Sequence, residues 1–300
     1  MNAIPPVRRR LLGSALRRHR ESLGYTLDQA ARILECDRSK ISRIETGQRG
    51  IRPKELRELL TEYGVGAGEQ EALLAIAHSG RQSGWWLDYT DVLSEAGQDY
   101  VIMELAASEI LVFEPNQVPE LLQTPEYARA LADADANVSG DDQREHAIEV
   151  KLARQRIVLG AKSPRLEVVI TEGALRQAVA APTAMRTQLE WLAAVADTGR
   201  VTGLPGDGSA PRGRARVALQ VVPFAAGAHA AVSGGPMTIL RFARNQGIGV
   251  VHLSGLSGGV SLADAAEVGR YLRTFAQLRS AALDPAASAR LLRAIARGER

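Results

Sequence analysis

The sequence predicts two modules: an all-α module of five helices, followed by an α+β module with a mainly antiparallel sheet. Three observations lead to this fold class. Up to about residue 80, apolar residues recur at helical spacing between capping residues and glycines. From residue 84 onward, helical patterns alternate with short runs of β-branched residues. The 300 residues are also enough for two hydrophobic cores. We therefore expect one module over residues 1–80 and a second over residues 84–300.

The first module is expected to contain five helices. Leu12, Ala15 and Leu16 have the spacing of one helical face, which predicts a helix over residues 8–23. Thr26 and Gln29 have the spacing of a capping box at the start of the second helix. The later boundaries rest on residues with known preferences for helix ends. These are Asp37 as the cap of the third helix, Gly47 as its end, Pro53 and Gly64 at the ends of the fourth, and residues 68–80 as the fifth.

The second module is expected to mix helices with strands. Helical patterns cover residues 96–110, 118–134, 141–160, 173–197, 261–282 and 286–298. Strands are expected at residues 110–113, 166–170, 217–222, 237–242 and 248–253. The last three strands follow one another without an intervening helix, which favours antiparallel neighbours. Residues 199–216 contain five glycines and two prolines and are expected to form a long surface loop.

The positive charge of the chain is concentrated near its start. Residues 1–60 contain 14 Lys and Arg against 7 Asp and Glu, whereas the other 240 residues contain 23 against 27. This asymmetry indicates a local anionic partner. The single cysteine, Cys36, excludes a disulfide framework and a cysteine-only zinc site. Arginines occupy the opening residues where a signal peptide has its apolar run, and no stretch approaches ~18 apolar residues, so we expect a cytoplasmic protein without a membrane span.

The expected third helix has two chemically different sides. Its sequence, SKISRIETG from Ser39 to Gly47, places Ile41 and Ile44 on one side, which is expected to face the core. The other side presents guanidinium, hydroxyl and ammonium groups, which are the groups that read base edges and bind phosphates. These groups belong to Arg38, Ser39, Lys40, Ser42, Arg43 and Thr46. Glu45 lies nearer the isoleucines, so we expect it to bond within the module. A short turn joins this helix to the preceding one, as in a helix-turn-helix.

The stretch TLDQAARILECDRSKISRIETGQRGI resembles the XRE, or lambda-repressor-like, DNA-binding domain of actinobacterial regulators. The resemblance implies a double-stranded DNA partner. It makes Arg38, Ser39 and Arg43 the expected base-reading residues. Phosphate contacts would come from Lys40, Thr46, Gln48 and Arg49, and Ser42 completes the expected DNA-binding set.

Two residues depart from the pattern of this family. Leu27 stands where the family often has a glutamine that holds the DNA backbone, and Glu35 stands in the turn where glycine is usual. Either change would weaken DNA binding or alter the DNA sequence that is read.

The second module resembles the companion domain of WhiJ-like actinobacterial regulators, which are described as antitoxin-like. The motifs include GWWLDY, ARQRIVL, VVPFAAGAHAA and MTILRF. The resemblance implies a small partner protein or a small-molecule effector. Glu120 replaces a glycine that the family usually has in VPGLLQT, and residues 252–259 also depart from the pattern. The candidate residues for ligand or partner binding are Trp85, Trp86, Phe113, Gln123, Tyr127 and Trp191. These aromatic residues could line a pocket with Gln123 as its polar anchor, or they could fill the core.

Residues 255–259 match the G-x-S-x-G pattern of a hydrolase nucleophile elbow. That chemistry requires a later histidine, but His252 is the last one in the chain, so we interpret the segment as a turn before a helix capped by Ser261. The histidines have no metal-ligand spacing and no phosphate-binding loop is present. We expect no catalytic residues, metal or cofactor.

The leading hypothesis is a homodimeric, sequence-specific transcriptional regulator that binds DNA. The alternative is a second module that binds or transforms a small metabolite while the helix-turn-helix is idle. Regulation of DNA binding by a ligand lies between the two.

Overall fold

The structure is a computed structural model that describes residues 7–78, 85–136, 138, 140–160, 163–201, 203, 215–242, 249–255 and 259–299. The chain divides into two compact units. The first unit comprises Met1–Leu87, Leu93–Ser108 and Leu240–Arg270. The second unit comprises Asp88–Val92, Glu109–Ile239 and Tyr271–Arg300. The module boundary expected at residues 80–84 falls largely outside the described residues, and it stays a prediction.

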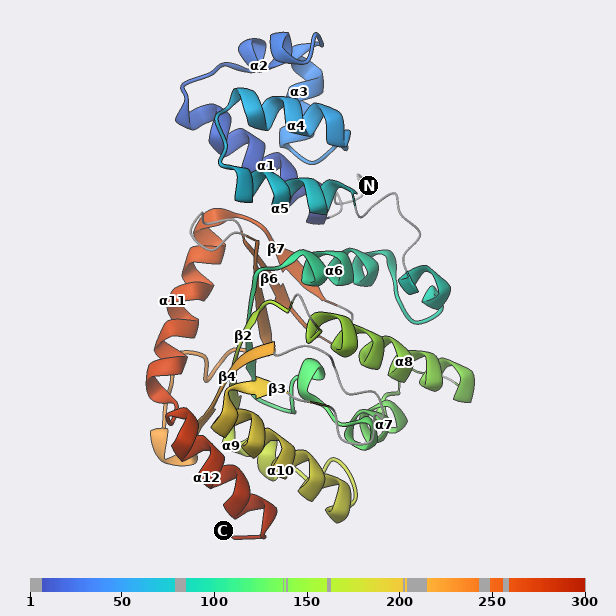
Figure 1. Ribbon diagram of the computed structural model, residues 1–300, viewed down its shortest axis with the longest axis vertical. Coiled ribbons are helices and arrows are strands. Elements are labelled where there is room, and N and C mark those ends of the chain that lie inside the picture. Colours follow the sequence, from blue (N-terminus) through green and yellow to red (C-terminus); the bar gives the residue numbers. More distant parts are fainter. Residues whose placement is uncertain are drawn as a thin grey trace. The chain divides into compact units, whose positions relative to one another are not determined.

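The start of the chain is all-helical, as expected (Figure 1). Its helices are α1 (Val7–Ser22), α2 (Leu27–Ile33), α3 (Arg38–Glu45), α4 (Pro53–Glu62) and α5 (Ala67–His78). Apolar side chains from these helices form a common core, in which Leu16, Ile41 and Leu56 are almost completely buried. Burial of such side chains, at about 1.5–3 kcal/mol each, is what stabilises helices as short as α2 and α3.

Local signals set most of these helix ends. The Thr26 N–H donates to the Gln29 Oε1 atom at 2.7 Å and the Gln29 N–H donates to the Thr26 Oγ1 atom at 3.2 Å, which confirms the capping box. Gly47 and Gly64 end their helices with φ of 75° and 65°, a conformation that glycine adopts without strain. Asp37 occupies the N-cap position of α3, but its side chain makes no capping hydrogen bond, so the expected cap is wrong in that respect.

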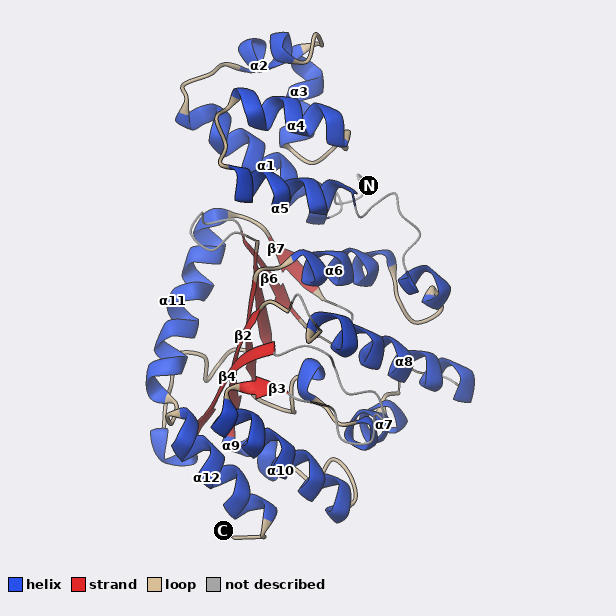
Figure 2. Cartoon of the chain, in the orientation of Figure 1, coloured by secondary structure: helices blue, strands red, loops and turns tan. Residues whose placement is uncertain are grey.

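The rest of the chain mixes helices with strands (Figure 2). In chain order its elements are η1 (Trp85–Tyr89), α6 (Glu95–Ala106), β1 (Glu109–Glu114), η2 (Glu120–Leu122), α7 (Pro125–Ala134), α8 (Asp141–Val158), β2 (Arg165–Thr171), α9 (Glu172–Arg176), α10 (Pro182–Thr198), β3 (Arg200–Val201), β4 (Ala215–Val222), η3 (Phe224–Ala226), β5 (Met237–Arg241), β6 (Gly249–Leu253), β7 (Val260–Leu262), α11 (Ala265–Ala281) and α12 (Pro285–Ala296).

The sheet is mixed, so the expectation of a mainly antiparallel sheet is wrong. Its strand order is β3-β4-β2-β1-β5-β6-β7. Strand β1 pairs with β2, and β2 with β4, in parallel, whereas the pairs β3/β4 and β6/β7 are antiparallel. The parallel pairs follow from the helices that separate these strands in the chain, because a parallel connection needs a crossover. Strands β4 and β5, which were expected to be neighbours, are separated by β2 and β1.

Several expected boundaries in this part of the chain are corrected. Ser261 lies in β7 and does not cap a helix; α11 begins later, and the Asp264 Oδ1 atom accepts hydrogen bonds from the N–H groups at its start. The helix expected over residues 118–134 is interrupted before α7, where Thr124 occupies the N-cap position. The expected loop over residues 199–216 includes β3 and the start of β4, and its remaining residues lie mostly outside the described part of the chain.

The core of the second unit lies around its parallel strands. The side chains of Phe113, Ile170 and Leu219 are fully buried. Helices α10 and α12 pack on each other and on β4 (Figure 1). The Ser288 hydroxyl of α12 accepts a hydrogen bond from the Val221 N–H of β4 at 3.0 Å. Among the described residues, no helix has the length and apolar character needed to cross a membrane.

Candidate nucleic-acid interface

The turn between α2 and α3 orients the candidate recognition helix. It is closed by hydrogen bonds from the Glu35 N–H to the Arg32 carbonyl at 3.2 Å and from the Cys36 N–H to the Ala31 carbonyl at 3.0 Å. Glu35 has φ of 47° and is the one non-glycine residue with a positive φ in the described part of the chain. The turn therefore requires the backbone conformation that glycine adopts most easily, although the sequence supplies a glutamate.

The inner side of α3 is fixed by apolar burial and by one buried ion pair. Ile41 and Ile44 are 1% and 2% exposed. Glu45 accepts from Arg20 of α1 through two hydrogen bonds, Nε to Oε1 at 2.7 Å and Nη2 to Oε2 at 2.9 Å. Arg20 also donates to the Tyr25 carbonyl at 2.6 Å, and the hydrogen bond with Glu45 raises the pKa of the guanidinium. The expectation that Glu45 bonds within the module is confirmed.

The close approach of α1 to the end of α3 also fixes the position of α3. This contact was not predicted from the sequence. A Cβ atom on Gly13 would lie 2.3 Å from the Ile44 carbonyl oxygen and 2.6 Å from that of Glu45. Gly47, just beyond the end of α3, is also close to α1, because a Cβ there would lie 2.9 Å from Cγ of Arg10. Glycine at these two positions lets the backbone of α1 lie directly against the C-terminal end of α3.

The outer side of α3 presents most of the predicted DNA-binding groups to solvent. The exposed members of the set are Arg38, Ser39, Arg43, Thr46, Gln48 and Arg49. The Arg43 Nε atom donates to the Ser39 carbonyl at 3.3 Å, and the Thr46 hydroxyl donates to the Ser42 carbonyl at 2.9 Å. The Arg38 guanidinium is 4.0 Å from the Asp28 carboxylate, with both side chains mostly exposed. Such an exposed pair costs little to rearrange, so these guanidinium groups remain accessible to a partner.

Lys40 and Ser42 are only partly exposed. The Lys40 ammonium lies 2.8 Å from the Glu55 Oε1 atom of α4, and both side chains are about four-fifths buried. Burial alone would raise the pKa of Glu55, but the hydrogen bonds from Lys40 and from the Arg52 N–H lower it below its usual value. Lys40 therefore connects α3 to α4, unlike the exposed members of the predicted set.

The candidate residues of the second module lie in different places. Phe113, Gln123 and Tyr127 are completely buried, and both Gln123 and Tyr127 hydrogen-bond the backbone of Val118. Trp191 is half-buried and its Nε1 donates to the Gly203 carbonyl at 2.8 Å. Trp85 lies in η1, and the side chain of Trp86 lies outside the described residues. A ligand site built from this set stays a prediction.

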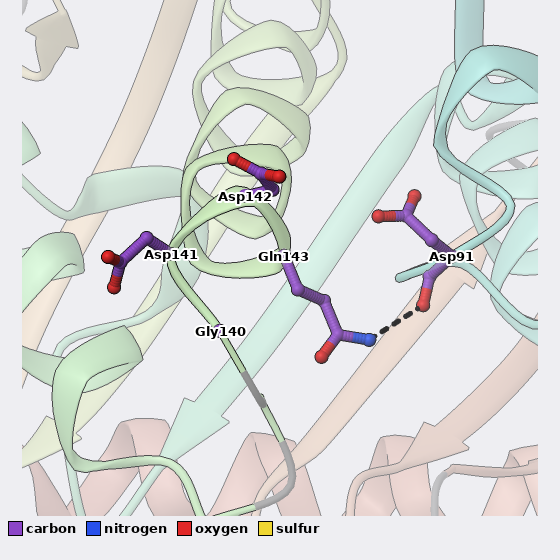
Figure 3. A pocket seen from close by; sticks show the side chains of 5 residues that line it. All are labelled: Asp91, Gly140, Asp141, Asp142 and Gln143. Atoms are coloured by element: carbon purple, nitrogen blue, oxygen red, sulfur yellow. Dashed lines mark hydrogen bonds between the residues drawn. The ribbon is translucent and has the colours of Figure 1, made fainter.

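A surface hollow of about 520 Å³ lies elsewhere, at the start of α8 (Figure 3). Its lining residues are Asp91, Gly140, Asp141, Asp142 and Gln143. The Gln143 side chain donates to the Asp91 carbonyl at 3.0 Å, and Asp141 points away from Asp91 in Figure 3. The three carboxylates make this hollow unsuitable for nucleic acid. Among the described residues, no group of three or more His, Cys, Asp or Glu side chains is placed to hold a metal ion.

The residues of the hydrolase pattern are only partly described. Ser257 lies outside the described residues. His252 is 2.9 Å from the hydroxyl of Ser261, measured from its Nδ1 atom, and Asp264 accepts from backbone N–H groups at the start of α11. His252 and Asp264, which lie on either side of residues 255–259 in the chain, thus both have structural partners.

Comparison with protein families assigns both parts of the chain. A helix-turn-helix domain matches residues 11–74, which run from α1 to α5. A domain of unknown function, DUF5753, matches residues 98–202 and 211–294, more than half of the chain. The chain belongs to the DUF5753 family. Neither the curated proteins nor the solved structures contain a match. The DUF5753 match begins within α6 and ends within α12, so it includes elements of both compact units.

Proposed function

We propose that the protein is a sequence-specific transcriptional regulator of the XRE, or lambda-repressor-like, type, and that α3 enters the major groove of DNA. One observation carries the proposal. The inner side of α3 is buried and ion-paired, whereas its outer side presents Ser39 and Arg43 to solvent. A side with guanidinium and hydroxyl groups and no carboxylate fits both base edges and phosphates. The helix-turn-helix match over residues 11–74 supports the same reading.

The exposed residues have distinct proposed roles. Arg38, Ser39 and Arg43 contact base edges, because they lie on the outer side of the helix. Thr46, Gln48 and Arg49 contact phosphates at the end of the helix and in the following loop. Lys40 has a smaller proposed role than its charge suggests, since binding a phosphate would compete with its ion pair to Glu55. Ser42, which is partly exposed, completes the proposed DNA-binding set.

The wider circuit is part of the same proposal. The regulator acts in the cytoplasm as a homodimer on a two-fold DNA site, which is the usual arrangement for helix-turn-helix proteins. The DUF5753 region senses a small partner protein or a small molecule, as in the WhiJ-like, antitoxin-like regulators of actinobacteria that its motifs resemble.

The test is selection of duplexes from a random pool with the full-length protein, followed by affinity measurements at two salt concentrations. We expect one enriched motif and an affinity that falls steeply with salt. Arg43→Ala should lose about 1–3 kcal/mol of discrimination at one base position. Arg129→Ala, which removes an exposed arginine from α7 in the second unit, is the charge-matched control and should leave the motif unchanged. If no motif is enriched, or if Arg43→Ala selects the same motif with the same discrimination, the proposal is wrong.

The alternative function is a DUF5753 region that binds or transforms a metabolite beside an idle helix-turn-helix. The departures from the family pattern motivate it, among them Glu35, whose positive φ is a conformation that glycine adopts more easily. Thermal stabilisation by a metabolite, in a protein that binds no duplex, would support this alternative.

A further inference from the structure

Helix α1 belongs to the helix-turn-helix match, yet it shares a compact unit with part of DUF5753. The first unit includes α1 to α5, and it also includes α6, β6 and β7 from the DUF5753 region. The family boundary along the chain is therefore not a boundary in the folded structure. Helix α1 contacts α3 on one side and elements of the DUF5753 region on the other, and these contacts link the two regions.

One side of α1 supports the candidate recognition helix. Gly13 lies against the last carbonyl groups of α3, and Arg20 holds Glu45. The backbone and Cγ of Arg10 lie against Gly47, two residues beyond the end of α3; a Cβ atom on Gly47 would lie 3.1 Å from the Arg10 Cα atom. The first turns of α1 therefore help to set the position of α3 and of the loop that follows it.

The other side of α1 contacts DUF5753 elements of the same unit. The Arg8 Nε atom is 3.8 Å from the Asp99 Oδ1 atom of α6, with side chains that are 20% and 10% exposed. The Arg10 Nη2 atom donates to the Ser261 carbonyl of β7 at 3.1 Å. Arg10 thus touches both the end of the recognition helix and the DUF5753 region.

The two acceptors on the DUF5753 side are connected to each other. The Ser261 hydroxyl lies 2.9 Å from the Nδ1 atom of His252 in β6. The ring of His252 lies on that of Tyr100, with centroids 4.3 Å apart, and Tyr100 follows Asp99 in α6. A change in the position of α6 or β7 would therefore move both partners of α1.

We propose that α1 couples the DUF5753 region to DNA binding: Asp99 and Ser261 hold the start of α1, and α1 in turn holds the recognition helix in its binding position. This proposal rests on the proposed function. It assigns α6 and β7 as the place where a sensed partner or effector changes DNA affinity. Coupling between two sites is reciprocal, so DNA binding should also stabilise α6.

The test compares two neutralised acids on α6. Asp99→Asn removes the partner of Arg8, whereas Glu95→Gln makes the same charge change at an exposed position of the same helix. Loss of a negative charge by itself would raise affinity for DNA. We nevertheless expect Asp99→Asn to lower affinity for the selected duplex by about 2- to 30-fold, the usual range of such coupling, and Glu95→Gln to cause no loss.

Amide hydrogen exchange supplies a measurement that does not depend on DNA. Asp99→Asn should increase deuterium uptake in α1 and at the end of α3, and Glu95→Gln should not. In the wild type, DNA should lower uptake in α6. Arg10→Lys keeps the charge but loses the guanidinium contact to Ser261, and it should reproduce both effects if Asp99→Asn does not fold; Arg17→Lys, on the exposed side of α1, is its control.

The outcomes separate the two proposals. If the wild-type protein binds no duplex, the proposed function is wrong, and deuterium uptake in the DNA-free variants still tests the contact from α6 to α3. If the folded Asp99→Asn and Arg10→Lys variants match their controls in both affinity and uptake, the coupling is refuted while DNA binding stands.

Discussion

The carboxyl group of Glu114 gives the stability of the second unit a predictable dependence on pH. Glu114 is the last residue of β1, is 9% exposed, and its Oε2 atom has no hydrogen-bond partner among the described residues. Burial, assisted by the nearby charge of Glu120, raises the pKa of Glu114 from 4.5 to about 8. The folded protein therefore holds this carboxyl group largely protonated at neutral pH.

The sign and size of the effect follow from proton linkage. Between pH 4.5 and about 8 the folded state keeps a proton that the unfolded state has lost, so the free energy of unfolding falls as pH rises. A difference of ~3.5 pKa units, at about 1.4 kcal/mol each, gives an upper limit of about 5 kcal/mol over this window. Glu114→Gln keeps the size of the side chain but cannot ionise. Its stability relative to the wild type should therefore increase with pH across the window.

The assay is urea unfolding at pH values stepped between 4.5 and about 8. Trp191 reports on the second unit when Trp85 and Trp86 are replaced by Phe, which matters because a chain with two units need not unfold in one step. Glu190→Gln, at an exposed position of α10, is the control and should follow the wild type. If Glu114→Gln also follows the wild type at every pH, Glu114 is not a buried neutral acid and the reasoning fails.

Three further substitutions test the structural elements that orient α3. Glu35→Gly should raise the melting temperature relative to Glu35→Ala, because glycine removes a backbone strain of about 1–2 kcal/mol at a positive φ; equal melting temperatures would contradict the turn geometry. Glu45→Ala should cost about 3–5 kcal/mol in denaturant unfolding, since it leaves the Arg20 charge buried without its partner; a cost below 1 kcal/mol would show that the pair is solvated. Gly13→Ala should lower both the melting temperature and DNA affinity, because its Cβ would overlap backbone carbonyls at 2.3 Å. Gly68→Ala meets open space and should show neither loss.

The part of the fold that the sequence predicted correctly depends on local signals. The Thr26 capping box and the glycine ends of α3 and α4 involve residues within a few positions of one another, so the pattern alone places them. The burial of Ile41 and Ile44 was predictable for the same reason, because helical periodicity assigns a face without knowledge of the partner. The exposed residues of α3 lie on the opposite side of the helix, so the same periodicity predicts them.

The features missed around α3 and in the sheet depend on residues distant in the sequence. The ion pair of Lys40 depends on how α4 returns along the chain, and no pattern within α3 signals it. In the sequence, Gly13 looks like an ordinary helix residue. Only the packing of α3 against it shows that a larger side chain would not fit there. Residues 217–222 and 237–242 follow one another in the chain, which suggested that they pair in the sheet. Instead, β4 pairs with β2, an earlier strand to which it is connected through helices. Strand partners are set by crossovers and long-range packing, which local periodicity does not encode.

One side of α3 is packed against the domain and the other side is exposed. This difference determines which substitutions the domain tolerates. Its rear is held by Gly13 and by the Arg20–Glu45 pair, whereas Arg38, Ser39 and Arg43 contribute nothing to the core. Under the proposed function, substitutions at these three positions would change the operator that is chosen, while the domain keeps its folding free energy. A duplicated gene could acquire a new regulon by a few surface replacements, and an engineer could retarget the protein by the same route.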